Sequence, residues 1–525
     1  MELAAPQAAP AAAPAPRAFT NLSFALKVVL AAALVALADG LFFFQRIGAT
    51  AGLFAVLLLL ALILVHPTLR RSRPALVALA LALTFAAALA DDPSLIAAGL
   101  FWGAASLAAM LARSKGFDDA WRWTLCLFAH AVRSLLGPLP ELGALGGARR
   151  RRRGALGIAA RLPLLVLPLI GSLVFGALFA AANPLISDAL SRLTLPALMT
   201  GFSITRLAFW FAAGFPLWAL FRPRLPAIHR GRDGPERSFA LPGASAPSVT
   251  LSLLAFNALF AVQNGLDLAF LWSGAPLPDR MTLAQYAHRG AYPLIATALL
   301  AGLFVLATLR PGSPLAASAS IRRLVYAWIA QNVLLVASTA LRTLDYIEAY
   351  SLTRLRIAAF VWMALVAVGL LLICWRIARG RSGAWLINAN ALAALAALSA
   401  CAFVDLGAVA ARWNVGHARE VGGRGAALDL CYLQQLGPSA LLSLVELESR
   451  PLPPATRDRA AWVRNLILDD LEPAQSDWRG WTWRNARRLG EAHRLAAERR
   501  LPRAAAERRP CGGATLPTLT ATTER

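Results

Sequence analysis

Long apolar runs recur along the chain and alternate with shorter polar stretches. Each run holds about 17 to 25 residues, which is enough for a helix to cross the hydrocarbon core of a bilayer. The runs predict membrane spans at 24–44, 48–65, 74–90, 93–112, 162–182, 198–221, 248–272, 291–309, 324–341, 357–375 and 384–410. The pattern therefore predicts an all-α fold, a polytopic transmembrane helical bundle of about eleven spans.

The polar stretches divide the chain into segments of different character. Beyond residue 411 the long apolar runs stop and charged residues become frequent, which indicates a small helical unit outside the membrane. In this unit, Gly437 and Pro438 predict a turn between two short helices. We predict a disordered Ala/Pro-rich tail at 1–23, four membrane helices at 24–112, a basic cytoplasmic loop with an interfacial helix at 113–161, a transmembrane core at 162–411, a soluble helical segment at 412–500 and a disordered tail at 501–525.

The cytoplasmic loop contains one amphipathic stretch, whose apolar positions fall on one helical face opposite charged residues. The apolar positions of this face are Trp121, Leu125, Phe128, Val132 and Leu136. A helix of this kind lies on a membrane surface, or it caps the bundle by packing against it. The sequence leaves both interpretations open.

The composition supports a membrane location, because 58% of the residues are hydrophobic and 15% are charged, whereas soluble domains carry about a quarter charged residues. A net charge of +24 would suit nucleic acid. The basic residues, however, cluster at the ends of the apolar runs, where they orient helices across a membrane, so no nucleic-acid partner is predicted. Alternate loops are rich in arginine, which places the N-terminus in the cytoplasm and the C-terminus in the periplasm.

The densest basic cluster consists of Arg149, Arg150, Arg151, Arg152 and Arg153. It acts as a topology signal, or it binds anionic lipid at about 1 kcal/mol per residue near a charged surface. The lipid bilayer is the predicted partner, and the sequence identifies no protein partner.

Polar side chains inside the predicted spans are the most informative feature for function, because they are costly in lipid and usually face the bundle interior. In the span at 248–272 they share about a third of the helix circumference, and the span at 324–341 repeats this arrangement. We predict that they border a polar vestibule in the outer leaflet, where arginine would bind carboxylate or phosphate. The alternative is that they pair with one another to fix helix packing. The candidate residues of the spans are Asp39, Arg206, Asn257, Gln263, Asn264, Asp267, Gln331, Asn332, Arg342, Asn390 and Asp405, and the loop predicted between the spans at 324–341 and 357–375 adds Asp345, Glu348, Arg354 and Arg356.

Signatures of common soluble enzymes are absent from the sequence. It contains no GxxxxGK phosphate-binding loop, no HExxH, no GxSxG and no glycine-rich dinucleotide fingerprint. The histidines and cysteines have no metal-ligand spacing. The sequence therefore predicts no catalytic residue, cofactor or metal, and it favours a role other than catalysis.

Residues 262–272 read VQNGLDLAFLW, residues 286–293 read YAHRGAYP, and residues 346–356 read YIEAYSLTRLR. Shorter segments of interest are Asn388-Ala-Asn390 and Arg412-Trp-Asn-Val415. Together they resemble a bacterial family of multispanning membrane proteins catalogued as a domain of unknown function, numbered 4153 or, in an older split, 4173. The resemblance implies an inner-membrane location and implies no reaction. Its motif residues coincide with the polar candidates.

Three kinds of function agree with this pattern. The first is transport or translocation of a polar or anionic solute or an envelope precursor, with the polar residues lining a path. The second is a non-catalytic scaffold or sensor whose C-terminal segment binds a periplasmic partner. The third is a membrane-embedded transferase for lipid or glycan, with Asp267, Asp345 or Glu348 as a general base.

Overall fold

The computed structural model of the protein describes residues 21–114, 116–136, 204–224, 245–269, 300, 302–305, 308 and 314–501. In these residues the chain forms helices joined by turns and short connections. The arginine run at 149–153 and the predicted span at 162–182 lie outside the described residues, as do most of the span predicted at 291–309 and nearly all of the two tails.

Six of the described helices are long and apolar enough to cross a membrane. They are α1 (Asn21–Phe42), α3 (Arg73–Asp91), α10 (Ala246–Asp267), α13 (Ala319–Tyr350), α14 (Arg354–Arg379) and α15 (Gly383–Phe403). Three shorter apolar helices are α2 (Thr50–Val65), α4 (Leu95–Leu111) and α9 (Ile204–Phe221). Each of these helices overlaps a predicted span. The polytopic helical bundle is therefore confirmed, and the count of eleven spans stays a prediction.

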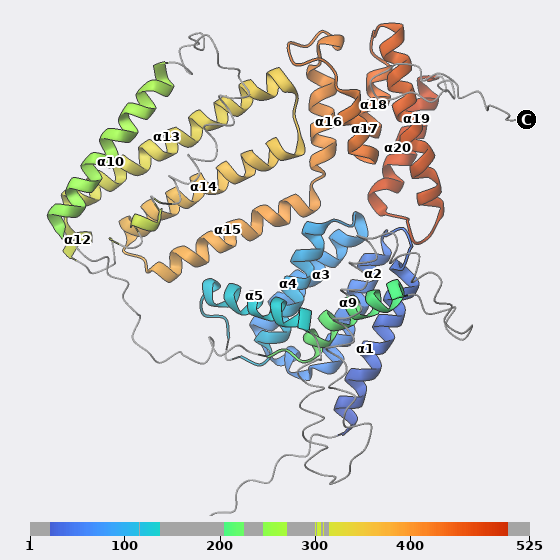
Figure 1. Cartoon of the computed structure of the whole chain (residues 1–525), viewed down its shortest axis with the longest axis horizontal. Helices are drawn as coiled ribbons and strands as arrows, with labels where there is room; N and C mark the ends of the chain where they lie inside the picture. Colours follow the sequence, from blue (N-terminus) through green and yellow to red (C-terminus); the bar gives the residue numbers. More distant parts are fainter. Residues whose placement is uncertain are drawn as a thin grey trace, which may run out of the picture.

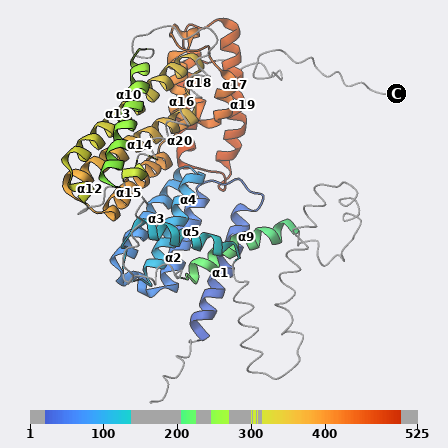
Figure 2. The ribbon, with the colours of Figure 1, turned by 60° about the vertical axis from the view of Figure 1, so that its left-hand side comes forward.

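The helices form three groups (Figures 1 and 2). Helices α1 to α4, α9 and the short α5 (Ala120–Leu136) pack together and are called the N-terminal unit. Helices α10, α13, α14 and α15 lie side by side in chain order and are called the helix layer. The helices after α15 have a core of their own and are called the C-terminal unit, which lies at one end of the membrane helices.

Small residues allow close packing in the N-terminal unit. Ala75, Ala78, Ala82 and Ala86 follow helical spacing along α3, and all four are buried. Gly52 of α2 lies against this helix, and a Cβ atom on Gly52 would approach the carbonyl oxygen of Ala86 to 2.7 Å. The lack of side-chain bulk therefore sets the separation of α2 and α3, as is common between membrane helices.

Helix α5 packs one side against the bundle, as in the second of the two arrangements that the sequence left open. Trp123 is buried against the bundle, whereas Trp121 and Phe128 are exposed. Asn388 of α15 fixes the start of this helix, because its side-chain oxygen accepts a hydrogen bond from the backbone N–H of Ala120 at 2.7 Å. One side of α5 thus caps the bundle and the other side presents apolar rings.

Aromatic residues form the centre of the helix layer. The one-turn helix α12 (Pro314–Ala317) comes directly before α13 in the chain. Trp328 contacts the rings of Phe256 and Phe304 at centroid distances of 5.2 and 5.8 Å. Helix α13 continues to Tyr350, past the end of the predicted span at 324–341. The acidic residues beyond that span, expected in a loop, therefore lie on the last turns of a helix.

The span predicted at 384–410 is divided between two helices. Helix α15 ends at Phe403, and α16 (Leu406–His417) begins after Asp405. The Asp405 carboxylate accepts hydrogen bonds from the backbone N–H groups of Gly407 at 2.8 Å and Ala408 at 3.1 Å, which caps the new helix. The apolar composition continues through this break, so hydropathy alone does not reveal it.

The C-terminal unit packs its helices around buried leucines such as Leu433 and Leu444. The turn predicted at Gly437 and Pro438 is confirmed as a short 3-10 helix between two helices. The elements after α16 are η6 (Arg419–Val421), α17 (Leu430–Leu436), η7 (Gly437–Ala440), α18 (Leu441–Glu448), α19 (Pro454–Ser476) and α20 (Trp483–Glu498).

Candidate functional site

The end of the membrane helices that the C-terminal unit covers is called the capped face (Figure 1). Arg484 of α20 joins two groups of helices there. Its guanidinium donates to Asp91 at 2.8 Å, to Asp92 at 3.1 Å and to the carbonyl oxygen of Phe403 at 2.8 Å. The planar fork of arginine suits such divergent acceptors. One side chain therefore links the α3–α4 turn to the end of α15.

Asp405 forms a second junction at the capped face. It accepts a hydrogen bond from the hydroxyl of Ser439 at 2.9 Å and forms an ion pair with Arg488. Burial raises the pKa of the Asp405 carboxyl, but the charge of Arg488 and the N–H of Ala408 outweigh this and hold the pKa below its ordinary value. Asp405 is thus an ionised capping and docking residue.

The loop between α1 and α2 is held to the same unit. Arg46 forms an ion pair with Asp470 at 3.0 Å, and the backbone N–H of Ala49 donates to the carbonyl oxygen of Trp481 at 2.6 Å. Gly48 lies so close to this segment that a Cβ atom would meet the Trp481 carbonyl oxygen at 2.4 Å. Backbone and side-chain contacts therefore fix the C-terminal unit to the N-terminal unit.

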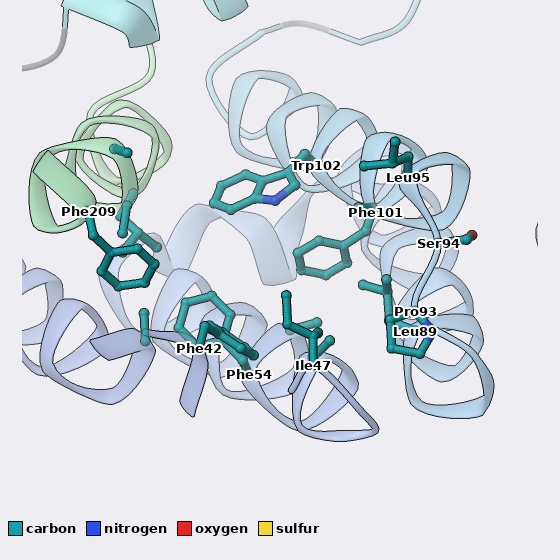
Figure 3. Close-up of a pocket in the computed structure, with 17 residues that line it drawn as sticks. Phe42, Ile47, Phe54, Leu89, Pro93, Ser94, Leu95, Phe101, Trp102 and Phe209 are labelled. Carbon is teal, nitrogen blue, oxygen red and sulfur yellow. The ribbon is translucent and has the colours of Figure 1, made fainter. Parts of the chain in front are cut away.

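A cavity of about 550 Å³ opens beneath these contacts, between α1, α2, α4 and α9 (Figure 3). The rings of Phe42, Phe101, Trp102 and Phe209 surround it. Ser94 and Trp102 are the two of its 17 lining residues that carry a side-chain polar atom. This apolar pocket, called the capped pocket, is therefore suited to a hydrocarbon group.

Asp39 and Arg206, both sequence candidates, pair with each other near this pocket. The Nε of Arg206 donates to Asp39 at 2.9 Å, and the indole N–H of Trp210 donates to the same carboxylate at 2.9 Å. Arg206 also lies 5.5 Å from the ring centre of Phe43. The pair joins α1 to α9 at the end of both helices.

A second set of candidates forms hydrogen bonds along the contact between α10 and α13. The amide of Gln331 donates to the side-chain oxygen of Asn257 at 2.7 Å, and Asn257 in turn donates to the carbonyl oxygen of Leu324 at 3.1 Å. Asn264, two turns further along α10, donates to the carbonyl oxygen of Gln331 at 3.1 Å. These bonds run from mid-helix toward the capped face.

The series ends at a buried ion pair between Asp267 and Arg342, whose side chains are 2% and 7% exposed. Gln263 donates to the Asp267 carboxylate at 3.0 Å. The polar ladder is defined as Asn257, Gln263, Asn264, Asp267, Gln331 and Arg342. Its members mostly pair with one another across two helices, as the packing alternative expected.

Several oxygens of the ladder nevertheless have no donor among the described residues. Three side-chain oxygens of the ladder and one of the neighbouring Asn332 are buried and accept no hydrogen bond within the described part of the chain. They are Asn264 Oδ1, Asp267 Oδ2, Gln331 Oε1 and Asn332 Oδ1. Asn332 uses its N–H₂ group for the carbonyl oxygen of Trp328 on its own helix, at 2.8 Å. This lack of donors is not explained by helix packing.

The remaining candidates lie elsewhere. Asn390 donates to the carbonyl oxygen of Leu386 on its own helix at 2.9 Å. Asp345 and Glu348 are exposed on the last turns of α13. Among the described residues, the structure distributes the fifteen candidates over α1–α9, α10–α13, α15 and the capped face.

Arg354 and Arg356 organise the short connection between α13 and α14. Arg356 donates to the carbonyl oxygen of Tyr350 at 2.7 Å and lies 4.1 Å from the ring centre of Tyr346. Arg354 reaches the C-terminal unit, where its guanidinium donates to the Ser439 hydroxyl at 3.3 Å. Both arginines therefore fix loops, and Arg354 connects the helix layer to the capped face.

Two of the motif segments meet at this connection. The side chain of Asn414 accepts from the backbone N–H of Leu352 at 2.7 Å and donates to the carbonyl oxygen of the same residue at 2.9 Å. Leu352 belongs to the segment 346–356, and Asn414 belongs to the segment 412–415. The motifs therefore build the joint between the helix layer and the C-terminal unit.

Sequence reasoning missed the cationic side of α20. Arg484, Arg487 and Arg488 have the spacing of one helical face, and this face meets the acids of the α3–α4 turn. The signal was present as an arginine-rich face and an isolated pair of aspartates, but their separation of 393 residues gave no reason to join them.

The described residues contain no group of three or more His, Cys, Asp and Glu side chains that could hold a metal ion. The polar residues of the ladder and of the capped face interact through hydrogen bonds and ion pairs.

The model of one protein family, a domain of unknown function (DUF4153), matches residues 75–447. The chain belongs to this family. The DUF4153 match covers more than two thirds of the 525 residues and extends from α3 to α18. It includes the ladder and the joint, and it confirms the resemblance drawn from the motifs. No curated protein and no solved structure matches the chain.

Proposed function

We propose that this DUF4153 protein is a bacterial inner-membrane translocator that moves a hydroxyl-rich, amphiphilic envelope precursor along the polar ladder. The observation that carries the proposal is the set of four buried oxygens without donors, on Asn264, Asp267, Gln331 and Asn332. An unpaired buried acceptor lowers the stability of the folded protein by about 1 to 3 kcal/mol. Several of them between two membrane helices favour a ligand that supplies donors.

The ladder also favours one chemistry of ligand. Arg342 is held by Asp267, so its charge is already balanced, and the four unpaired oxygens on Asn264, Asp267, Gln331 and Asn332 require donors. Sugar hydroxyls meet this requirement, whereas a bare phosphate would add further acceptors. The proposal therefore places a glycan-bearing lipid before a simple anion.

The orientation is part of the proposal, with the N-terminus in the cytoplasm and the capped face in the periplasm. Cys431 of the C-terminal unit is disulfide-bonded, and disulfides persist in oxidising compartments. Arg71 lies in a basic connection at the opposite end. A cysteine introduced at Trp478 should react with a membrane-impermeant maleimide in intact cells, and one introduced at Arg71 should not.

The other candidate functions receive less support. The cationic face of α20 binds the membrane helices through Arg484 and Arg488, so this surface is not available to a separate periplasmic partner. Asp267, considered as a general base, is enclosed in an ion pair.

Translocation can be measured in proteoliposomes that contain an acyl-labelled fluorescent glycolipid, with dithionite added outside to bleach the exposed label. The protein should carry the glycolipid between leaflets faster than it carries fluorescent phosphatidylglycerol. Gln331→Met removes two polar atoms and leaves the ion pair intact, and it should slow glycolipid movement at least about tenfold, which corresponds to 1.4 kcal/mol in the barrier.

Ser252→Ala is the matched control, because Ser252 lies on α10 and bonds to its own helix through the carbonyl oxygen of Ser248 at 2.9 Å. It should leave the rate unchanged. Movement of both lipids at the rate of protein-free vesicles would refute translocation. Faster movement of phosphatidylglycerol than of glycolipid would refute the assignment of a hydroxyl-rich ligand.

A further inference from the structure

The capped pocket lies in the N-terminal unit and is independent of the ladder. Its space arises because several wall positions are alanine, among them Ala51, Ala98 and Ala213. An empty apolar cavity destabilises a protein, because the atoms that line it lack contacts on one side. Water gains little in such a space, because it needs two to four polar partners. The pocket therefore favours an apolar occupant over water.

The mouth of the pocket contains strongly exposed apolar residues. Leu95, at the start of α4, is 93% exposed, and Ile47, before α2, is 56% exposed. Both lie at the ends of membrane helices, where exposed apolar side chains suit contact with lipid better than contact with bulk water. An occupant can therefore enter from the bilayer, at the depth of the capped face.

The volume excludes a large occupant. One turn of α-helix, about 5.4 Å long and 10 to 12 Å wide, fills roughly 400 to 600 Å³. The pocket of about 550 Å³ would hold a single turn and cannot accept a transmembrane helix. A flexible hydrocarbon chain suits this space, because it can follow the walls between α2, α4 and α9.

Polar contacts surround the mouth on the side of the C-terminal unit. Arg484 binds Asp91 and Asp92, which directly precede the lining residue Pro93. Trp481 binds Ala49, two residues from the lining residue Ile47. The rim is thus polar and fixed while the interior is apolar, which is the arrangement that a lipid with a head group and a chain requires.

We propose that the capped pocket binds one acyl chain of a membrane lipid from the leaflet at the capped face. The chain lies between α2, α4 and α9, and the head group lies at the rim formed by the loops at 46–49 and 91–94. The C-terminal unit holds both loops, so it also holds the mouth in shape. This site does not depend on translocation along the ladder.

The test uses the full-length protein in nanodiscs that contain a phospholipid with a diazirine at the end of one acyl chain. After illumination, peptide mapping by mass spectrometry should find the label on pocket residues such as Phe54 and Phe101. Ala213→Phe fills the pocket and should lower this labelling at least about tenfold, because displacing two methylene groups already removes that much affinity. Ala98→Phe fills it from another helix and serves if the first variant does not fold.

Ala87→Phe is the matched control, because Ala87 is exposed on α3 and is not a lining residue. It should leave pocket labelling unchanged. Equal labelling of Phe54 in the wild type and in both filled variants would overturn the proposal. Labelling no denser in the pocket than on the exposed face of α3 would also overturn it, since it would show annular lipid contact only.

Discussion

The N-terminal unit and the helix layer hold their membrane helices together in different ways. The N-terminal unit relies on small residues, with buried alanines along α3 and Gly52 of α2 in close contact with it. The helix layer adds polar contacts to its aromatic centre, and in these contacts Asn257, Gln331 and Asn264 form hydrogen bonds across α10 and α13. Close apolar packing and interhelical hydrogen bonds are the two main means of joining helices in lipid.

The two regions also differ in what they leave unfilled. Alanine-rich packing leaves a cavity where several small side chains face one another, and this cavity is the capped pocket. Polar packing leaves buried oxygens that lack donors. Each region therefore lacks a different kind of contact, and each suits a different part of an amphiphilic molecule, a hydrocarbon chain or a hydroxylated group.

The largest expected effect is the loss of stability when the arginine of an ion pair is removed, and this loss should differ between the two regions. Arg342→Gln leaves the buried carboxylate of Asp267 without its cation and should destabilise the protein by about 3 to 5 kcal/mol. Arg206→Gln should cost about 1 kcal/mol or less, because the Arg206 side chain is 39% exposed at the end of α9 and Asp39 retains the hydrogen bond from Trp210. Unfolding in mixed micelles of rising SDS content measures both variants.

The combined change Asp267→Arg with Arg342→Asp is the control, because it restores opposite charges between the same helices. It should recover part of the stability that Arg342→Gln loses. Equal losses for Arg342→Gln and Arg206→Gln would show that the ladder contributes no more to packing than the pair between α1 and α9.

The sequence predicts the helices well because membrane spans depend on a local property, the length of an apolar run. It fails where structure depends on a local cap or on distant partners. The apolar run at 384–410 hides the break at Asp405, although an aspartate directly before Leu406 is a usual helix start. Charge suggested a loop at Asp345 and Glu348, but a helix can continue beyond the membrane with its internal hydrogen bonds intact.

The candidate site also divides into features that follow from local sequence and features that depend on distant partners. Periodicity placed Asn257, Asn264 and Asp267 on one face of a helix. In the structure all three side chains bond to α13, in agreement with that placement. It could not show that the partner of Asp267 is Arg342, since partners follow from how two helices pack. The pocket was beyond prediction, because a cavity depends on which small residues of four helices face one another.

The C-terminal unit sharpens the comparison, because it buries an ion pair of the same kind outside the candidate membrane helices. Glu448 accepts a hydrogen bond from Arg464 at 2.7 Å, and burial raises the pKa of Glu448 to about 7 despite that arginine. The ordinary value is 4.5, so between these values the folded state binds more protons than the unfolded state. The stability of the unit should therefore fall by up to about 3 kcal/mol as the pH rises from 4.5 through 7.

Hydrogen exchange of the α18 and α19 amides in the full-length protein measures this dependence. Glu448→Gln carries no titratable group and should flatten it over the same range. An unchanged pH profile in Glu448→Gln would assign the dependence to another group. The ladder, enclosed in the membrane, should show no comparable change in exchange of the α10 amides.

The smallest expected effect tests the packing of small residues in the N-terminal unit. A Cβ atom at Gly52 would lie 2.5 Å from the Cβ of Ala90 and 2.7 Å from the carbonyl oxygen of Ala86. Because these atoms belong to the adjacent helix, Gly52→Ala must push α2 and α3 apart, and it should destabilise the protein by about 1 to 3 kcal/mol.

Gly99→Ala is the matched change on α4, where nothing lies within 4 Å of the added atom. It should stabilise the protein by about 0.5 to 1 kcal/mol, because alanine loses less backbone entropy in a helix than glycine. The SDS titration reads the sign of each change directly. Opposite signs at two glycines of one unit would show that contact between α2 and α3, rather than helix propensity, holds the N-terminal unit together. A stabilising effect at both positions would instead mean that this contact can relax without cost, and the contrast with the polar ladder would no longer rest on close packing.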